Sequence, residues 1–181
     1  MRFDVYSIDN APEKSRATLA GVKQAYGFVP NLFGVFAESP AAVQAYAAIG
    51  KALADAGLNA VEQQVVFLSV STENECKYCV AAHSTIAQGV KMPEEVLAAL
   101  RAGEALPDAR LQALSAFTRA VINKRGWVAG EDLQAFVDAG FEQRHVLDVL
   151  TIIAMKTLSN YTNHIAETPL DDAFSAQAWK A

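Results

Sequence analysis

Residues 61–84 read VEQQVVFLSVSTENECKYCVAAHS, and this stretch contains both cysteines of the chain. Cys76 and Cys79 stand three residues apart, and His83 follows Cys79 by four residues. On a helix, which turns about 100° per residue, these three side chains share one face. Two thiols and an imidazole on one face indicate a redox site, a metal site or part of a packed core, and the surrounding sequence has to separate these interpretations.

Helix start and stop signals recur along the whole chain. Proline and small polar residues stand where helices are expected to begin, and glycine stands where they are expected to end. Asn59 followed by Glu62 has the pattern of a capping box, in which each side chain accepts a hydrogen bond from the other residue's backbone. The expected helices span approximately residues 12–27, 40–57, 59–71, 74–89, 92–103, 107–122, 130–140 and 142–166.

The last expected helix is apolar nearly all round between Val146 and Leu158. A helix without a polar face has to be covered on every side, so we expect it at the centre of the core or shared with a neighbouring subunit. No period-two alternation of convincing length and no Asn-Gly or Asp-Gly turn accompanies these helices. The predicted fold class is therefore all-α, with residues 1–181 forming a single domain.

The composition excludes some partners and favours others. Hydrophobic residues make up 52% of the chain and the mean hydropathy is +0.13, which favours apolar surface buried between the copies of a homo-oligomer. Lysine and arginine number 15 against 20 acidic residues, which gives a net charge of -5. Because no strong basic cluster offsets this charge, nucleic acid is excluded as a partner.

The sequence also predicts a protein that is neither exported nor held in a membrane. The N-terminal residues MRFDVYSIDN lack the apolar core of a secretory signal, and the longest apolar run, residues 149–155, is much shorter than the roughly 20 residues of a membrane span. We expect a cytoplasmic protein. In that reducing compartment a lone cysteine pair is more often catalytic or metal-binding than a permanent disulfide.

The cysteine helix has two candidate N-caps, either Thr72 with Glu75 as its capping-box partner, or Asn74. Both place Cys76 in the first turn or just beyond it, where unpaired N–H groups and the positive end of the helix dipole favour a thiolate. By this argument Cys76 is the more acidic thiol. A thiolate beside a second thiol can attack an oxidant, become a sulfenic acid and be captured as a disulfide.

Two other interpretations compete with redox chemistry. The cysteines can be small buried hydrophobes, since free cysteine is among the most buried residue types. A structural zinc site needs four ligands, so His145 or His164 would have to join the two cysteines and His83. Zinc bound by the thiols would block the proposed nucleophile, and we predict no metal site.

The pattern Cys76-x-x-Cys79-x-x-x-His83, preceded by VEQQVVFLSVSTEN, resembles the signature of the alkylhydroperoxidase D-like family, also called the carboxymuconolactone decarboxylase superfamily. The resemblance extends over nearly the whole chain. It includes two further stretches that are similar to peroxidase-related members, GFVPNLF with ESP at residues 27–33 and 38–40, and NYTNH with LD at residues 160–164 and 170–171.

The resemblance implies an alkylhydroperoxidase D-like helical bundle that assembles as dimers, trimers or hexamers. It also implies a peroxiredoxin-type oxidoreductase of antioxidant defence that reduces organic hydroperoxides. In the family's cycle the second cysteine, here Cys79, attacks the peroxide, Cys76 resolves the sulfenic acid, and His83 belongs to a proton relay that activates Cys79. No cofactor is bound, and an external dithiol, such as a lipoyl group on a partner protein or a thioredoxin-like protein, reduces the disulfide.

The sequence departs from the family's pattern at two positions. Gln64 stands twelve residues before the first cysteine, where the best-known members carry a glutamate at the far end of the relay, and Tyr78 stands where they carry a histidine. An amide can orient water but cannot take a proton. The relay is therefore predicted to be shortened, with Gln64 at its far end and Glu62, Glu73 or Glu75 as candidate substitutes.

Two alternative functions remain. A non-enzymatic redox sensor would use the same disulfide to change its oligomeric state, and it would oxidise once instead of turning over. Decarboxylation of a carboxymuconolactone is the family's other named activity, but the members that perform it generally lack the cysteine pair.

An aromatic cluster and a third histidine are further candidates for the site. Phe28, Leu32, Phe33 and Phe36 can line a pocket for an apolar alkyl peroxide, although core or subunit interface is the more frequent use of such a stripe. His164 lies at the polar end of the last expected helix and is a candidate neighbour of the cysteines.

Overall fold

The computed structural model describes residues 2–180. Its elements are α1 (Glu13–Tyr26), α2 (Asn31–Phe36), α3 (Pro40–Ala52), η1 (Leu53–Asp55), α4 (Ala60–Glu73), α5 (Lys77–Gly89), α6 (Glu94–Ala102), α7 (Ala109–Asn123), α8 (Glu131–Asp138), α9 (Gln143–Ala166) and η2 (Asp172–Gln177), where η denotes a 3-10 helix. These residues contain no strand, so the predicted all-α class is confirmed.

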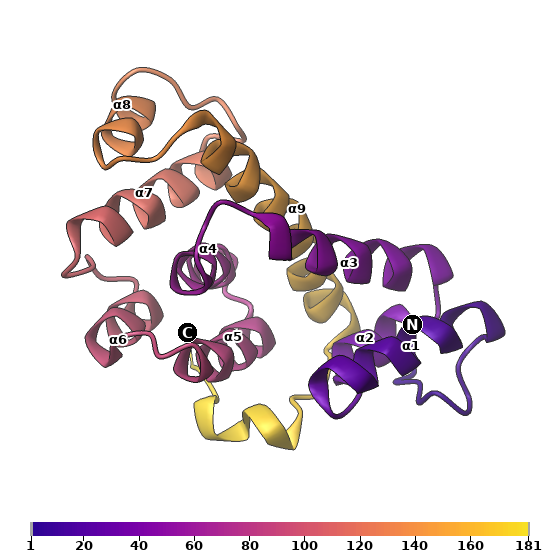
Figure 1. Cartoon of the computed structure of the whole chain (residues 1–181). Coiled ribbons are helices and arrows are strands. Elements are labelled where there is room, and N and C mark those ends of the chain that lie inside the picture. The colour runs from indigo at the N-terminus through magenta and orange to yellow at the C-terminus, as the bar shows by residue number, and fades with distance from the viewer. Residues whose placement is uncertain (1, 181) are drawn as a thin grey trace.

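Helix α4 lies at the centre of the bundle and packs against α5, α7 and α9 (Figure 1). Its sequence explains this position, because Val65, Leu68 and Val70 point in different directions around the helix and are all fully buried. The predicted capping box fixes its start. The Asn59 side chain accepts a hydrogen bond from the Glu62 backbone at 3.0 Å, and Glu62 Oε2 accepts one from the Asn59 backbone at 2.9 Å.

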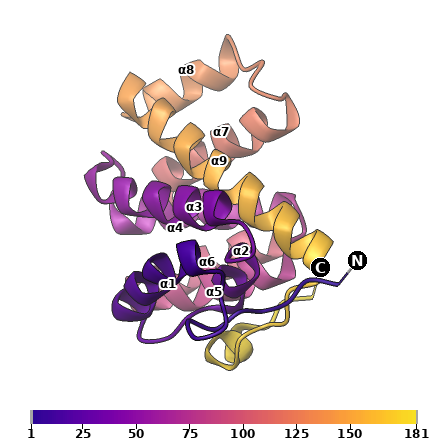
Figure 2. The same cartoon turned by 90° about the vertical axis from the view of Figure 1, so that its right-hand side faces the viewer.

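The other helices surround α4. Helices α1, α2 and α3 pack together on one side, α6, α7 and α8 lie on the other, and the long α9 contacts α3, α4 and α7 (Figures 1 and 2). The C-terminal η2 packs against α5, so the chain's last described segment covers the helix that carries the cysteines. The cysteine helix is thus enclosed by α4, α6, α9 and η2.

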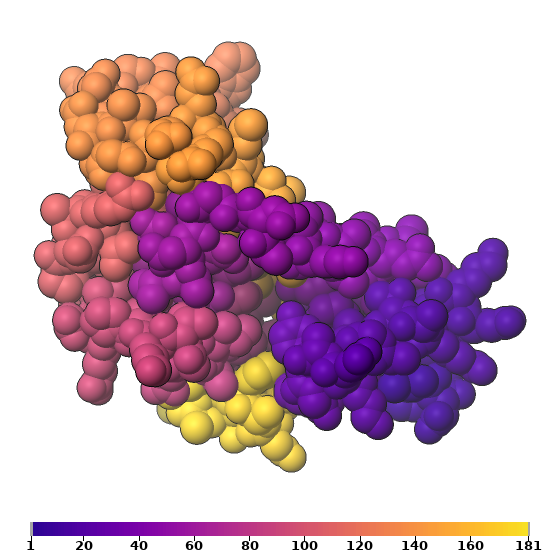
Figure 3. Space-filling model, viewed as in Figure 1, coloured from indigo at the N-terminus to yellow at the C-terminus, as the bar shows by residue number. Residues whose placement is uncertain are grey.

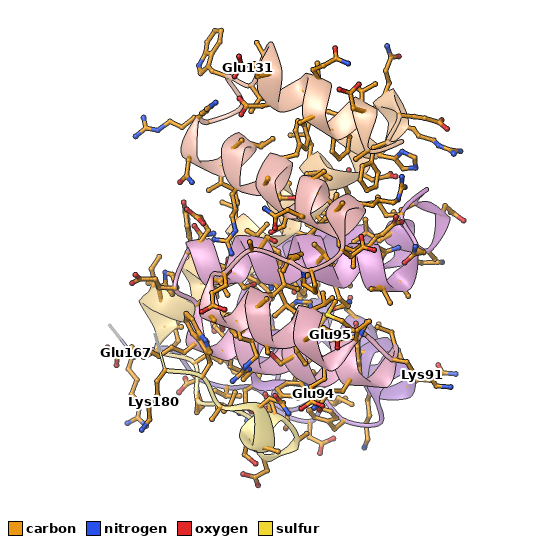
Figure 4. The ribbon with its side chains drawn as sticks, turned by 90° about the vertical axis from the view of Figure 1, so that its left-hand side faces the viewer. Lys91, Glu94, Glu95, Glu131, Glu167 and Lys180 are labelled. Carbon is orange, nitrogen blue, oxygen red and sulfur yellow. The ribbon has the colours of Figure 1, made fainter. Side chains whose placement is uncertain are left out.

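Charged side chains lie on the outside of this bundle. Lys91, Glu94 and Glu131 are exposed, and Figure 4 shows Lys91 and Glu131 at the edges of the molecule, where ionised groups normally lie. Lys156 is a clear exception, because its side chain belongs to α9 and only 1% of the residue is exposed. A charge buried this deeply requires a partner.

The predicted N-caps of the cysteine helix were wrong. Asn74 ends α4, and the hydroxyl of Thr72 bonds back to the Leu68 carbonyl at 2.9 Å. Glu75 has a φ of 52°, which turns the chain sharply, and Cys76 itself is the N-cap residue of α5. The two helices meet in a turn too tight for either of the predicted capping side chains to act.

Within the described chain α9 is covered on one side only, so of the two predicted alternatives the position at the centre of the core is not met, and sharing with a neighbouring subunit stays a prediction. Leu147 and Ile165 lie on the same side of the helix and are 64% and 70% exposed. The opposite side is buried and contains Lys156, which the description of an apolar helix overlooked.

None of the helices within residues 2–180 combines the length and the hydropathy that crossing a membrane requires.

Candidate active site

The two cysteines lie together at the start of α5 and are both free thiols with 1% of their surface exposed. Cys76 is the N-cap residue and Cys79 is in the first turn. One amide group from α9 reaches both sulfurs, because Asn163 Nδ2 is 3.2 Å from Cys79 Sγ and 3.8 Å from Cys76 Sγ. The thiol of Cys79 also lies 3.9 Å from the hydroxyl of Ser159.

His83 lies one turn further along α5, at the centre of a chain of polar contacts. Its ring stacks on Phe67 with centroids 4.3 Å apart. Its Nδ1 is 3.0 Å from Gln64 Oε1, and its Nε2 is 3.1 Å from Lys156 Nζ. Because an amide oxygen only accepts and an ammonium only donates, these contacts put the His83 proton on Nδ1 and make Nε2 an acceptor.

Within this series of polar contacts, the positive charge is on Lys156 and not on His83. Burial, and after it the positive charge of Lys156, lowers the pKa of His83 well below its ordinary value, so the imidazole is neutral. Burial alone would lower the pKa of Lys156, but its contacts with the cysteines, the negative charge of Cys79 first among them, outweigh it and raise that pKa. Lys156 is therefore a buried ammonium.

The hydrogen bond between the two thiols and the buried ammonium together favour ionisation of Cys79. Burial raises the pKa of the Cys79 thiol, but the hydrogen bond from Cys76 and the charge of Lys156 together hold it well below its ordinary value. The pKa of Cys76 is raised, first by its hydrogen bond to Cys79 and then by burial. The prediction from the helix dipole, that Cys76 is the more acidic thiol, was wrong because the hydrogen bond between the thiols, and after it the charge of Lys156, favours the negative charge on Cys79.

Cys79 lies on the wall of a cavity with a volume of about 440 Å³. Polar groups of Gln64, His83 and Lys156 line part of it, and most of the remaining wall is apolar. In the described part of the chain Cys76 lies outside this lining, so Cys79 is the sulfur that faces the cavity. Figure 3 shows a hollow between the N-terminal helices, α5 and the C-terminal segment.

Aromatic side chains form much of the cavity wall. Phe28, Leu32 and Phe33 line it, which supports the pocket interpretation of the predicted cluster for three of its four members. Phe36 instead packs in the core against Tyr46, with ring centroids 4.9 Å apart. The same cluster therefore supplies both core and cavity wall.

Tyr78, at the position where the family's pattern has a histidine, lines the cavity beside Cys79, and its hydroxyl bonds to other parts of the chain. Its hydroxyl donates to Asp171 Oδ2 at 2.5 Å and accepts from the Leu32 backbone at 3.3 Å. Asp171 also accepts from the Asn31 backbone, at 3.0 Å. This tyrosine thus joins the cysteine helix to α2 and to the C-terminal segment, whose Phe174 lines the cavity.

The acidic residues considered as substitutes in the relay lie elsewhere. Glu62 is occupied by the capping box and by Arg110, whose Nε is 3.0 Å from Glu62 Oε1. Glu73 pairs with Arg119 at 2.7 Å, and Glu75 is exposed. Of the residues predicted to form the relay, the structure brings only Gln64 to His83.

The two other histidines are also distant from the cysteines. His145 forms part of the N-terminal cap of α9, where its Nδ1 accepts from the Glu142 backbone at 2.8 Å. His164 is exposed and lies against the Tyr161 ring. No group of three or more histidine, cysteine, aspartate or glutamate side chains within the described residues is arranged to hold a metal ion.

Sequence reasoning missed the residues that α9 contributes to the site. Lys156 stands in the run IIAMKTLSN, and a lysine within an otherwise apolar helix is a signal of a buried, paired charge. Asn163 lies in the stretch NYTNH that carried part of the family resemblance, but that stretch was not connected to the sulfurs. Nothing in the local sequence indicates that these side chains meet the cysteines.

Comparisons with known proteins agree with this geometry. The carboxymuconolactone decarboxylase family matches residues 40–121. No curated protein matches the chain significantly.

Solved structures match over almost the full length. A peroxidase-related protein from Ralstonia eutropha JMP134, described as an alkylhydroperoxidase AhpD core, has a TM-score of 0.85 and 27% identity, with 99% of this chain and 97% of that chain covered. A peroxidase-related protein from Silicibacter sp. TM1040 has a TM-score of 0.80 and 18% identity, with coverage of 96% and 95%. The debrominase Bmp8 in complex with 2,3,4-tribromopyrrole has a TM-score of 0.78 and 16% identity, with coverage of 98% and 95%.

The latter two identities are low enough that these neighbours show the shared fold alone. The match over residues 40–121 contains the cysteine pair and His83, and the Ralstonia structure extends the similarity to both ends of the chain. Residues 40–121 therefore match the carboxymuconolactone decarboxylase family, and the chain as a whole has the fold of the alkylhydroperoxidase D-like proteins.

Proposed function

We propose that the protein is a thiol-dependent peroxidase that reduces organic hydroperoxides through a disulfide cycle of Cys79 and Cys76. One observation carries this proposal: the sulfur on the cavity wall, Cys79, is the one that Lys156 keeps ionised, and a protonated thiol lies beside it. A thiolate that faces a mainly apolar cavity suits attack on a neutral, apolar peroxide.

In the first step the Cys79 thiolate attacks the terminal oxygen of the hydroperoxide. The O–O bond breaks, the hydroxyl stays on sulfur as a sulfenic acid, and the alkoxide leaves. Lys156 is a positioned proton donor for the alkoxide, which departs as an alcohol. His83 and Gln64 hold the ammonium in place, since His83 Nε2 accepts one of its hydrogens.

In the second step the Cys76 sulfur attacks the Cys79 sulfur. The S–O bond breaks, and the hydroxyl takes the Cys76 proton and leaves as water. An external dithiol then exchanges with the disulfide and becomes a disulfide itself. Both cysteines regain a proton, and the Cys79 proton passes to Lys156, which restores the thiolate and ammonium pair.

The reductant and the compartment follow from this cycle. A lipoyl group on a partner protein, or a thioredoxin-like protein, supplies the two electrons that each turnover consumes. We place the enzyme in the cytoplasm, where thiol reductants keep cysteine pairs reduced.

We also propose that the enzyme is a homo-oligomer whose subunits meet along α9. Leu147, Leu150, Tyr161 and Ile165 are all exposed and lie within about 60° of one another around the helix axis. They form an apolar stripe about 27 Å long on the side opposite Lys156. Exposed apolar surface of this extent is typical of subunit contacts.

A second candidate function is the reductive removal of a halogen from an aromatic ring. The aromatic wall of the cavity favours it, because Phe28, Phe33, Phe67 and Phe174 can pack around a flat ring. The similar fold of a debrominase makes this reaction worth a direct assay.

Steady-state turnover with dihydrolipoamide tests the proposal. Wild-type protein is expected to consume many equivalents of cumene hydroperoxide, and Cys79→Ser is expected to consume none. Oxidation by a single equivalent without turnover would support the redox sensor instead. Bromide release from a bromopyrrole, without hydroperoxide consumption, would support the second candidate.

A further inference from the structure

One side of α9 is a buried polar stripe. Lys156, Ser159, Asn160 and Asn163 follow each other at spacings of three, one and three residues, which places them on one side of the helix. All four residues are buried, with exposed fractions of 6% or less. Lys156 and Ser159 have partners in the site already described, and the two asparagines remain to be explained.

Asn163 contacts the reacting atoms directly. Its Nδ2 lies 3.2 Å from the Cys79 sulfur and 3.8 Å from the Cys76 sulfur. An amide nitrogen is a donor only, and a thiolate is an acceptor, so the shorter contact is a charge-assisted hydrogen bond to ionised Cys79. The longer contact reaches the thiol that closes the disulfide.

The asparagine amides are incompletely satisfied. Asn163 Oδ1 and Asn160 Nδ2 are buried and have no hydrogen-bond partner among residues 2–180, although Asn160 Oδ1 accepts from Asn74 at 3.0 Å. A buried polar atom without a partner lowers stability, and a leucine of similar volume would avoid that cost. The amide of Asn163 is thus placed for contact with sulfur rather than for stability.

We propose that Asn163 is a catalytic residue whose side-chain amide nitrogen binds both cysteine sulfurs. It supports the Cys79 thiolate before the attack, and afterwards it keeps Cys76 beside the sulfenic acid. Of these two roles, only the retention of Cys76 rests on the proposed peroxidase cycle. The contact with the Cys79 thiolate exists in the reduced protein and does not depend on that cycle.

The second role concerns a competition between two reactions of the sulfenic acid. Attack by Cys76 breaks the S–O bond and releases water, whereas attack on a second hydroperoxide adds another oxygen and gives a sulfinic acid. An amide within reach of both sulfurs favours the first reaction, because it limits how far Cys76 can move away. Loss of the amide should therefore divert Cys79 toward overoxidation.

The first test is alkylation of the reduced protein by iodoacetamide as a function of pH, with Cys79 modification followed by peptide mass mapping. Asn163→Leu is expected to raise the midpoint of Cys79 alkylation by about one pH unit, which is the size of one hydrogen bond to a charged group. Asn163→Asp keeps an acceptor of the same shape but replaces the donor with a negative charge, and it should raise the midpoint further.

The second test measures the products of oxidation by excess cumene hydroperoxide. Asn163→Leu is expected to increase the ratio of Cys79 sulfinic acid to the Cys76–Cys79 disulfide severalfold. His164→Gln is the matched control, because it changes the adjacent residue on the exposed side of α9 and should leave both the midpoint and the ratio unchanged.

The outcomes separate this inference from the proposed function. An unchanged alkylation midpoint in both Asn163 variants would overturn the contact with the thiolate, and an unchanged product ratio would overturn the role in disulfide closure. If the wild-type protein fails to consume hydroperoxide, the proposed function is wrong, and the alkylation midpoints still decide the role of Asn163. If thermal melting shows that Asn163→Leu is unfolded, the smaller Asn163→Ala takes its place with the same expected shifts.

Discussion

The chemistry of individual residues in this site is set by one buried charge. Lys156 is 1% exposed and lines the cavity, and its ammonium is held between a thiolate and a neutral imidazole. The imidazole is therefore a hydrogen-bond acceptor that orients the ammonium, and the ammonium is the group that lowers the pKa of Cys79. In the proposed cycle, Lys156 activates Cys79, so no proton has to travel beyond His83 and Gln64 can stand where the family's pattern has a glutamate.

Replacing Lys156 with methionine tests this assignment of charge. Without the ammonium, the Cys79 pKa is expected to rise toward the ordinary thiol value of 9.0. The fraction of thiolate at pH 7 then falls about a hundredfold, but a more basic thiolate is a better nucleophile, so this effect alone should lower the rate of peroxide reduction about tenfold. Loss of the proton donor to the alkoxide should lower the rate further.

The pH dependence of peroxide reduction should differ between the wild-type protein and Lys156→Met. A lowered Cys79 pKa means that wild-type activity persists as the pH falls below the usual thiol range and is lost only near that lowered pKa. Activity of Lys156→Met should instead be low at neutral pH and recover as the pH rises through about 9. Lys77→Met, which changes an exposed lysine beside Cys76, should keep the wild-type profile, and a neutral-pH rate that is equal in all three proteins would contradict the role of Lys156.

At the scale of elements, the polarity of α9 is reversed relative to an ordinary surface helix. The side that faces the protein interior carries Lys156, Ser159 and Asn163 toward the sulfurs, and the opposite side exposes leucine and isoleucine. A helix of this kind looks apolar all round when its sequence is read, because the polar residues of the buried side are few. Its tertiary position, not its local sequence, shows that they lie beside the sulfurs and His83.

The junction of α5, α2 and the C-terminal segment rests on the Tyr78 hydroxyl. Tyr78→Phe removes the donor to Asp171 and the acceptor for the Leu32 backbone, so it should lower the free energy of unfolding by about 1–3 kcal/mol. The expected result is a lower melting temperature together with a higher KM for cumene hydroperoxide, since Phe174 of the same segment lines the cavity.

Tyr161→Phe provides the comparison for this prediction. Tyr161 is 53% exposed on α9, and loss of its hydroxyl should change neither the melting temperature nor KM. A Tyr78→Phe protein with wild-type stability would show that the hydroxyl contacts do not hold the segment in place.

The parts of the fold that have local signals were predicted well. The capping box of Asn59 and Glu62 marked the start of α4, and the spacing of Cys76, Cys79 and His83 marked the side of α5 on which the site lies. The short helix α2 was not predicted, and the start of α5 was misplaced because the turn at Glu75 carries no glycine. A left-handed residue other than glycine gives no signal in the sequence.

The part of the site that α9 supplies could not be predicted, because its position depends on how the whole molecule packs. Lys156 follows Cys76 by 80 residues, and Asn163 follows Cys79 by 84 residues. Only the packing of α9 against α4 and α5 brings these two side chains to the sulfurs. Contacts between residues so far apart in the sequence depend on the packing of the complete bundle, and they produce no periodic pattern in the sequence. The ionisation order of the two thiols depends on those residues, which is why the argument from the helix dipole gave the wrong order.

The assembly of the molecule is tested by charging the outer stripe of α9. Leu147→Glu and Ile165→Glu are each expected to shift the protein from an oligomer to a monomer in light scattering, because a carboxylate cannot be buried in an apolar contact without a partner. Lys51→Glu, at an exposed position on α3, is the control and should remain oligomeric. A monomeric wild-type protein would refute assembly through this stripe.

The position of Cys79 as the cysteine on the cavity wall has a kinetic consequence for the proposed cycle. Oxidant and reductant have to reach the same sulfur through the same space, so they occupy it in turn and each keeps the other out. Such an enzyme slows down when its oxidant is abundant and its reductant is scarce. Its protective capacity would then be limited by the supply of dithiol rather than by the speed of the attack on peroxide.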